Sequence, residues 1–121
     1  MKKILLVDDH TDIRRLVRIT LGSTFEVFEA EDGVKGLRLA LEIVPDLIVL
    51  DVMMPGALDG LQVLGAIRSA PVLSNTRVIM VTARGQVSDY EDGMLRGADA
   101  YFIKPFSPLA LVAAIKEHLG L

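Results

Sequence analysis

Short apolar runs alternate along this chain with longer stretches whose apolar residues recur every three or four positions. Such runs are typical of buried strands, and such repeats are typical of amphipathic helices. The runs predict strands at Ile4–Val7, Phe25–Phe28, Leu47–Leu50, Val78–Val81 and Tyr101–Ile103. Strict alternation of strand and helix favours parallel strands joined by right-handed crossovers, with helices on both faces. The predicted fold class is therefore α/β, a doubly wound parallel sheet of five strands.

Apolar stripes place five helices between and after these strands. Gly22 provides a stop for the first helix, and Ser107 and Pro108 suit the N-cap and first position of the last. The fourth helix, near Val87 to Leu95, has a weaker stripe. The stripe of the first helix is Ile13, Leu16, Val17 and Leu21, opposite Arg14, Arg15 and Arg18. The stripe of the second helix is Val34, Leu37, Leu41 and Val44, and that of the third is Leu61, Val63, Leu64 and Ile67. The stripe of the last helix is Leu111, Val112, Ile115 and Leu119.

The second strand differs from its neighbours. Glu26 and Glu29 flank its apolar residues, whereas the first, third and fourth strands are apolar almost throughout. Central strands of a doubly wound sheet are covered on both faces, and charge on an edge strand discourages pairing with another molecule. The second strand is therefore predicted at an edge.

Length and composition restrict the classes of function. The 121 residues suit one domain, 1–121, and the 51% hydrophobic content suits a globular core. The absence of cysteine excludes disulfides and thiolate chemistry, and Asp8 and Asp9 interrupt the first apolar run before a signal peptide or membrane span could form. A net charge of -3 argues against direct nucleic-acid binding. We expect a cytoplasmic protein.

Polar residues follow four of the predicted strands at the point where each ends. Asp8 and Asp9 follow the first, Asp51 the third, Thr82 the fourth and Lys104 the fifth. Ligands bind at this edge of a doubly wound sheet. Three carboxylates there repel one another unless they share a cation, and an all-oxygen set favours Mg²⁺. A carboxylate can also attack phosphorus to form an aspartyl phosphate.

Four motifs resemble the signature segments of response-regulator receiver domains, the phosphorylated modules of two-component signalling. They are LLVDDH at 5–10, LIVLDVMMPG at 47–56, VTAR at 81–84 and GADAYFIKPFSP at 97–108. Their order and spacing match over essentially the whole chain. The resemblance implies a flavodoxin-like sheet with strand order 2-1-3-4-5.

The resemblance also implies roles at the strand ends. Asp51 corresponds to the phosphoacceptor, and Asp8, Asp9 and the main-chain carbonyl of Met53 correspond to the other ligands of Mg²⁺, for which Mn²⁺ is a possible substitute. Lys104 corresponds to the active-site cation. A receiver of this kind is not an enzyme in the usual sense, although it assists its own phosphorylation and dephosphorylation.

Switching residues and partners follow from the same resemblance. Thr82 and Tyr101 correspond to the hydroxyl and the aromatic ring that move together, and the peptide before Pro105 is expected to be cis. The phosphoryl donor would be a histidine kinase or a histidine phosphotransfer protein, docking near Ile13 and Arg14. The surface of helix four, strand five and helix five would then signal to a downstream protein or a fused output domain, with no membrane and no direct nucleic acid involved.

Each residue taken alone has a plainer interpretation. Asp8 and Asp9 could cap the first helix, Asp51 could be a turn residue and Lys104 a solvated lysine. His10 is better explained by filling its loop than by binding metal, and His118 suits the end of the last helix. Plain packing or capping could also account for Thr82, Tyr101, Met53 and Met54. The conjunction of all these residues at one sheet edge favours the receiver interpretation.

Other classes of protein fit less well. A phosphatase of the haloacid-dehalogenase type also uses an Asp nucleophile and Mg²⁺, but it carries a second acid where this chain has Met53. A degenerate receiver that works as an unphosphorylated binding module would not need Asp51, Thr82 and Lys104. A nucleotide-binding flavodoxin-like protein would carry a glycine-rich loop after the first strand, which this sequence lacks.

The chain departs from the family pattern in two places. The loop 56–58 carries one extra residue, which either reshapes the rim of the site or bulges into solvent. Ala100, Ala110 and Ala114 stand where receivers of winged-helix regulators usually have acid, acid and base. Charges at these positions mediate dimers in that subfamily, so we expect a monomer or a weak dimer.

This expectation is tested by analytical ultracentrifugation with and without beryllofluoride, a phosphoryl mimic. Because the charged residues of that interface are replaced by alanine, the activated protein should remain a monomer or dimerise weakly. A tight activated dimer through this face would contradict the prediction.

Overall fold

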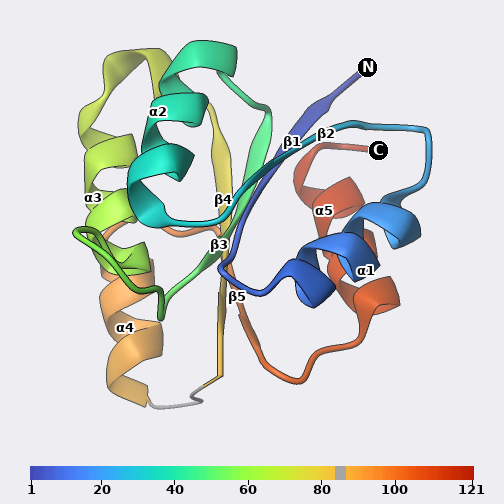
Figure 1. Cartoon of the computed structure of the whole chain (residues 1–121). Helices are drawn as coiled ribbons and strands as arrows, with labels where there is room; N and C mark the ends of the chain where they lie inside the picture. The colour runs from blue at the N-terminus through green and yellow to red at the C-terminus, as the bar shows by residue number, and fades with distance from the viewer. Residues whose placement is uncertain (84–86) are drawn as a thin grey trace.

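The computed structural model describes residues 1–83 and 87–121, over which strands and helices alternate (Figure 1). The strands are β1 (Lys3–Val7), β2 (Glu26–Ala30), β3 (Leu47–Asp51), β4 (Arg77–Thr82) and β5 (Ala100–Ile103). The helices are α1 (Thr11–Leu21), α2 (Gly33–Ile43), α3 (Gly60–Ser69), α4 (Val87–Leu95) and α5 (Pro108–His118), with a short 3-10 helix η1 (Pro71–Leu73) after α3. Over these ranges, no helix has the length and apolar character needed to cross a membrane.

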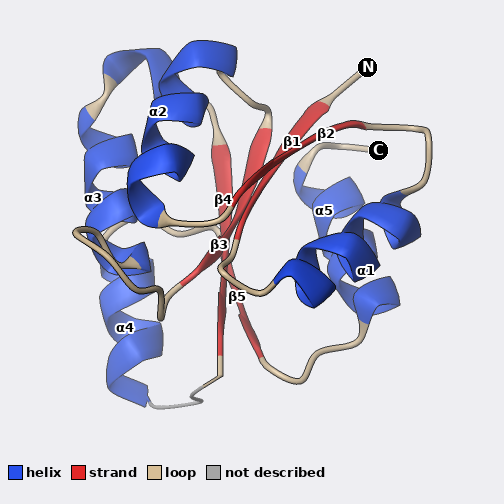
Figure 2. Cartoon of the chain, in the orientation of Figure 1, coloured by secondary structure: helices blue, strands red, loops and turns tan. Residues whose placement is uncertain are grey.

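The strands form a parallel sheet in the order β2-β1-β3-β4-β5. Figure 2 shows this sheet as the middle of three layers, with α1 and α5 on one face and α2, α3 and α4 on the other. The predicted fold class and strand order are confirmed. The predicted edge position of the second strand is confirmed as well, because β2 stands at the end of the strand order, next to β1.

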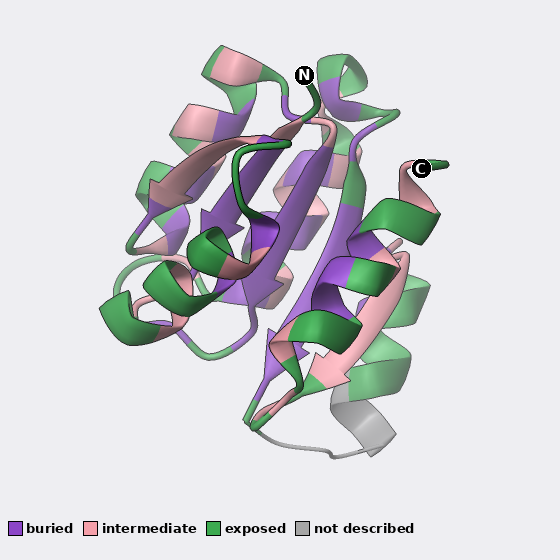
Figure 3. Ribbon diagram, turned by 90° about the vertical axis from the view of Figure 1, so that its right-hand side faces the viewer, coloured by how far each residue is buried: buried purple, intermediate pink, exposed green. Residues whose placement is uncertain are grey.

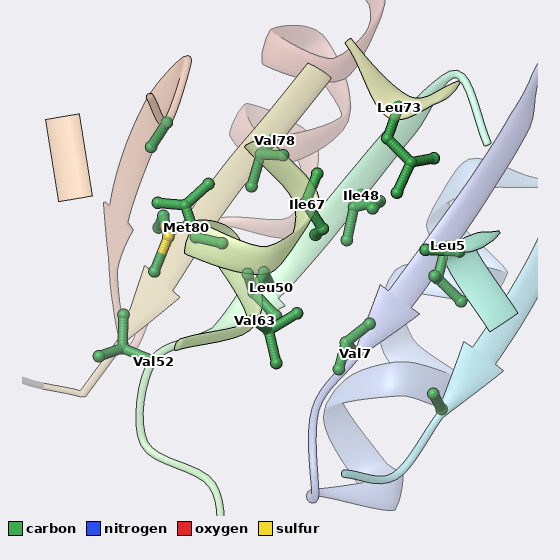
Figure 4. Close-up of a cluster of buried hydrophobic side chains, with 14 of the residues drawn as sticks. Leu5, Val7, Ile48, Leu50, Val52, Val63, Ile67, Leu73, Val78 and Met80 are labelled. Atoms are coloured by element: carbon green, nitrogen blue, oxygen red, sulfur yellow. The ribbon is translucent and has the colours of Figure 1, made fainter. Parts of the chain in front are cut away.

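Two hydrophobic cores form because successive residues of a strand point to opposite faces. In β1, Leu5 and Val7 pack beneath α2 and α3, whereas Ile4 and Leu6 pack beneath α1 and α5. The same alternation runs through β3 and β4, which are almost entirely buried (Figure 3). Figure 4 shows the first of these cores, in which side chains of α3 such as Ile67 meet those of β3 and β4.

The end signals read from the sequence are confirmed. Gly22 caps α1 with a φ of 69°, a conformation that glycine adopts readily. Ser107 caps α5 by accepting a hydrogen bond from the backbone N–H of Ala110 at 3.2 Å, and Pro108 is the first residue of that helix. His118 is its last residue. The second strand starts at Glu26, one residue later than predicted, since Phe25 turns into the core beneath α1 and α5.

The predicted apolar stripe of α2 is wrong. Of that stripe, Val34, Leu41 and Val44 are 40%, 46% and 41% exposed, and only Leu37 packs against the core. Small residues face the sheet instead, with Gly36 and Ala40 buried. A Cβ atom on Gly36 would lie 2.7 Å from Cγ1 of Val7, so α2 approaches β1 too closely for a large side chain at this position.

The stripe of α1 is also wrong in part. Leu16 is 48% exposed, while Arg14, expected on the outer face, has a side chain only 12% exposed. Arg14 and Arg18 both reach Glu29 on the edge strand, at 3.0 Å and 2.7 Å. Burial by itself would raise the pKa of Glu29, but the hydrogen bonds from Arg18 and Arg14 outweigh it and lower the pKa below its usual value. This network ties α1 to β2.

The extra residue between β3 and α3 bulges into solvent. Pro55, Gly56 and Ala57 are exposed, and Gly56 has a φ of 102°. The end of the loop is anchored, because Asp59 and Gln62 form a reciprocal capping box at the start of α3. Of the two alternatives left open by the sequence, the structure therefore favours a solvent-exposed bulge.

The close approach of α2 to β1 predicts opposite effects for two glycine-to-alanine substitutions in helices. Gly65→Ala in α3 should raise the free energy of unfolding by about 0.5–1 kcal/mol, because its Cβ would meet nothing within 4 Å and alanine favours the helix. Gly36→Ala gains the same propensity but must displace Val7, so it should lower that free energy by about 1–2 kcal/mol. Urea unfolding measures both, and stabilisation by Gly36→Ala would refute the packing argument.

Candidate functional site

The carboxyl ends of four strands meet at one edge of the sheet. Asp8 follows β1, Asp51 ends β3, Thr82 ends β4 and Lys104 follows β5. Their positions in neighbouring strands, rather than closeness in the chain, bring them together: Asp51 lies opposite Val81 in the register of β3 with β4. The sheet thus gathers the polar residues that the sequence placed at strand ends.

Four side chains form a compact cluster at this edge. Potential ligand atoms of Asp8, Asp9, His10 and Asp51 all lie within 4.8 Å of one another. Asp8 and Asp51 are buried, at 7% and 2% exposure. Three carboxylates in so small and dry a volume repel one another strongly, so positive charge is needed to hold them together.

Lys104 supplies positive charge from the protein itself. Its Nζ lies 2.8 Å from Oδ2 of Asp8 and 3.4 Å from Oδ2 of Asp51, and the lysine side chain is only 11% exposed. The peptide bond between Lys104 and Pro105 is cis, as the resemblance implied. One ammonium group therefore faces Asp8 and Asp51, and against three carboxylates it leaves the cluster with excess negative charge.

The excess negative charge and the burial of the cluster affect the pKa and the hydrogen bonding of Asp51. Burial, followed by the negative charge of Asp8, raises its pKa to about 7, although Lys104 opposes the shift. In the part of the chain that is described, Oδ2 of Asp51 and Oδ1 of Asp9 are buried without accepting a hydrogen bond. Buried oxygens of this kind usually have a partner, and an oxygen-binding cation is one that would satisfy both.

His10 joins the cluster, although the sequence favoured loop filling over metal binding for this residue. Its backbone N–H donates to Oδ1 of Asp8 at 2.8 Å, and its Nδ1 lies 2.9 Å from the same oxygen. His10 is also the N-cap residue of α1, without a side-chain cap hydrogen bond. The alternative in which Asp8 and Asp9 cap this helix is therefore wrong, because both precede the cap position.

The remaining predicted residues surround the cluster. Thr82 is fully buried, and Tyr101 is partly buried, with its ring 5.4 Å from that of Tyr90 in an edge-on arrangement. The backbone N–H of Met53 donates to Oδ1 of Asp51 at 3.3 Å, while the Met53 side chain is exposed. Met53 is thus not core filling, whereas Met54 is buried in the core beneath α2 and α3. Arg84, the last residue of the VTAR motif, lies outside the described residues.

Comparison with known proteins adds to this geometry. A family model described as the response regulator receiver domain matches residues 4–116. The chain belongs to this family. The resemblance seen in the motifs is confirmed, and the chain is a receiver domain of two-component signalling systems.

Relatives of this receiver domain are about twice its length. Transcriptional regulatory protein ResD of Bacillus subtilis is 43% identical over 118 residues, which cover 97% of this chain and 48% of ResD. DNA-binding dual master transcriptional regulator RpaA of Synechocystis is 39% identical over 120 residues, covering 98% of this chain and 49% of RpaA. The chain therefore spans about half the length of these relatives.

Solved structures agree with the flavodoxin-like fold. A CheY-like receiver domain protein from Methanospirillum hungatei superposes with a TM-score of 0.92 at 30% identity, covering 99% of this chain and 94% of that one. Chemotaxis protein CheY4 of Vibrio cholerae gives a TM-score of 0.89 at 32% identity, covering 97% and 98%.

Sequence reasoning named Arg14 only as part of the donor-docking surface and missed its role in building the receiver's site. The Arg14 guanidinium donates from Nη1 to the backbone carbonyl of Asp8 at 2.6 Å and from Nε to Glu29 at 3.0 Å. Arg14 thereby fixes the turn that carries the acidic residues. Its place in the helical stripe suggested a solvent-facing side chain, and only the closeness of β2 to α1 reveals the contact.

The raised pKa of Asp51 predicts how stability depends on pH without metal. An aspartic acid ionises near pH ~4 in the unfolded chain but near pH 7 in this fold. The protonated form therefore stabilises the fold below pH ~4, and this contribution is lost as the pH rises to about 7. Asp51→Asn is neutral throughout, so at pH 8 it should be more stable than the wild type by a few kcal/mol, roughly.

Urea unfolding in EDTA between pH 4 and 8 checks this expectation. The two proteins should approach each other in stability near pH 4, where Asp51 is protonated in the folded state and about half protonated in the unfolded state. Titrating groups remote from Asp51 cancel in the comparison because they are common to both proteins. A difference in stability that stays constant over this pH range would contradict the pKa assignment.

Proposed function

We propose that this receiver accepts a phosphoryl group on the carboxylate of Asp51 from a phosphorylated histidine of a histidine kinase or histidine phosphotransfer protein. The observation that supports it best is the Asp51 side chain itself, which is 1% exposed, faces Lys104 at 3.4 Å and has an oxygen without a hydrogen bond in the described chain. A carboxylate poor in hydrogen bonds and next to a cation is suited to attack phosphorus.

The acidic cluster fits a divalent cation. Asp8, Asp9, Asp51 and the main-chain carbonyl of Met53 would hold Mg²⁺, with Mn²⁺ as a substitute, since these hard cations prefer oxygen ligands. Two buried oxygens without hydrogen bonds, on Asp9 and Asp51, support this assignment. Bound there, Mg²⁺ would neutralise negative charge on the transferring phosphoryl group.

The protein's own residues then have distinct tasks. An oxygen of Asp51 forms the new bond to phosphorus as the bond from phosphorus to the donor imidazole nitrogen breaks, and the imidazole leaves with that electron pair and takes up a proton. The ammonium group of Lys104, fixed by Asp8 at 2.8 Å, offsets charge on the phosphoryl oxygens. Thr82 donates its hydroxyl hydrogen to one of those oxygens.

Phosphorylation would shift the receiver between two conformations. Thr82 lies at the end of β4 and Tyr101 lies in β5, so a hydroxyl drawn toward the phosphoryl group changes the space available to the aromatic ring. The Tyr101 ring already contacts Tyr90 of α4, which links the site to the α4, β5 and α5 surface. A downstream protein or a fused output domain would distinguish the two populations.

The donor is proposed to dock in an apolar groove next to Lys104. This groove, of about 410 Å³, is lined by Ile13, Leu16, Ala83, Lys104, Pro105 and Phe106. The exposed side chain of Leu16, 48% accessible, belongs to it. Arg14 is engaged with Asp8 and Glu29, so Ile13 rather than Arg14 would contact the donor.

The alternatives receive less support. A haloacid-dehalogenase-like phosphatase needs a second acid close to the nucleophile, whereas Met53 occupies that position with an exposed apolar side chain. A degenerate, unphosphorylated receiver would have no use for a buried carboxylate whose pKa is raised to about 7 at the cost of stability.

Phosphate incorporation from acetyl phosphate in the presence of Mg²⁺ tests the proposed function. The wild type should acquire acid-labile phosphate, and Asp51→Asn should acquire none because the nucleophile is lost. EDTA should abolish labelling of the wild type, since no cation then offsets the charge of the phosphoryl group.

The matched control is Asp59→Asn. Asp59 is an exposed carboxylate of the same loop, and asparagine caps a helix as well as aspartate does, so labelling should persist. Continued labelling of Asp51→Asn, with circular dichroism showing that it is folded, would exclude Asp51 as the phosphoacceptor.

A further inference from the structure

The imidazole of His10 stands within the acidic cluster. Its Nδ1 lies 2.9 Å from Oδ1 of Asp8 and 3.3 Å from Oδ1 of Asp9. The ring is 58% exposed, so it sits at the mouth of the cluster and not in its interior. A histidine here presents a nitrogen donor to a site that otherwise offers only oxygen.

Two oxygens in the same cluster lack hydrogen bonds. In the described chain, Oδ2 of Asp51 and Oδ1 of Asp9 are buried and accept none, and the Asp51 side chain is 1% exposed. The Asp9 oxygen is the one that lies 3.3 Å from Nδ1 of His10. Potential ligand atoms of these residues lie within 4.8 Å of one another, and the Lys104 ammonium lies beside them, 3.4 Å from Oδ2 of Asp51 and 3.5 Å from Nδ1 of His10.

We propose that His10 is a direct metal ligand, which makes this site bind borderline transition-metal dications such as Co²⁺ and Ni²⁺ more tightly than an all-oxygen site would. The proposal rests on the cation site of the proposed function and names a further ligand within it. Imidazole nitrogen is a good ligand for Co²⁺, Ni²⁺ and Zn²⁺, whereas Mg²⁺ prefers oxygen. His10 would thus decide which cations compete with Mg²⁺.

The geometry requires only a small adjustment. Ligand atoms about 2.1 Å from a shared ion are at most about 4.2 Å apart, and the four candidate atoms here lie within 4.8 Å of one another. The His10 ring is 58% exposed and is therefore free to rotate toward a shared ion. Its ring hydrogen must lie on Nε2 so that the Nδ1 lone pair faces the metal, a tautomer that solvent at the mouth of the site can accommodate.

Calorimetric titration of the tag-free protein with CoCl₂ and, separately, with MgCl₂ tests the proposal. His10→Ala should weaken Co²⁺ binding by about tenfold or more, as loss of one ligand implies, and should change Mg²⁺ binding by less than about threefold. His118→Ala is the matched control, because the chain has two histidines and this one lies at the far end of α5. It should leave both affinities unchanged.

Proton NMR of the Co²⁺-loaded protein reports coordination directly. A coordinated imidazole gives a strongly shifted, exchangeable N–H resonance, which should be present in the wild type and in His118→Ala and absent in His10→Ala. Equal loss of Co²⁺ and Mg²⁺ affinity in His10→Ala, or no loss of either, would overturn the proposal, since His10 would then only position the acids or do nothing.

Failure of this inference is distinct from failure of the proposed function. If His10→Ala binds Co²⁺ as the wild type does but Asp51 is still phosphorylated with Mg²⁺, His10 is no ligand and the receiver chemistry stands. If the wild type binds neither cation, both the site and the inference are wrong.

Discussion

The repulsion among Asp8, Asp9 and Asp51 is the constraint on which the rest of this site depends. Three carboxylates gathered in a largely buried volume oppose folding, and the single ammonium of Lys104, 2.8 Å from Asp8 and 3.4 Å from Asp51, offsets only part of that opposition. The remainder appears as a pKa of about 7 for Asp51 and as buried oxygens without hydrogen bonds in the described chain. A site held in this state attracts positive charge, which is the property that the proposed cation-assisted phosphoryl transfer requires.

The sheet makes this unfavourable arrangement tolerable. Its central strands β1, β3 and β4 are covered on both faces, so the apolar burial beneath two helical layers stabilises the positions at which the charged residues must lie. Arg14 adds a local support by binding the Asp8 carbonyl and Glu29 together. Apolar packing along the strands thus stabilises the fold, whereas the clustered charges at the carboxyl ends of the strands destabilise it. Ligands are expected to bind at these ends.

The features that could be predicted from sequence are those with a local cause. Apolar runs marked the strands, and Gly22, Ser107 and Pro108 marked helix ends, because each acts through its own backbone or its near neighbours. The side of α2 that faces the sheet could not be predicted. Gly36 lies on that side, where α2 approaches Val7 of β1 closely, and this approach is a tertiary contact. Arg14 was misplaced for the same reason, as its partner Glu29 belongs to another element.

By itself, the sequence determined the fold class, the family and the identity of the residues at the strand ends, because these follow from periodicity and from motifs contiguous in the chain. Only the tertiary structure decided how far apart those residues lie, that Lys104 faces both Asp8 and Asp51, and that His10 stands within the acidic cluster. The reason is physical. Distances between side chains on different strands depend on register, helix packing and the direction of each side chain, and none of these is encoded in any one segment.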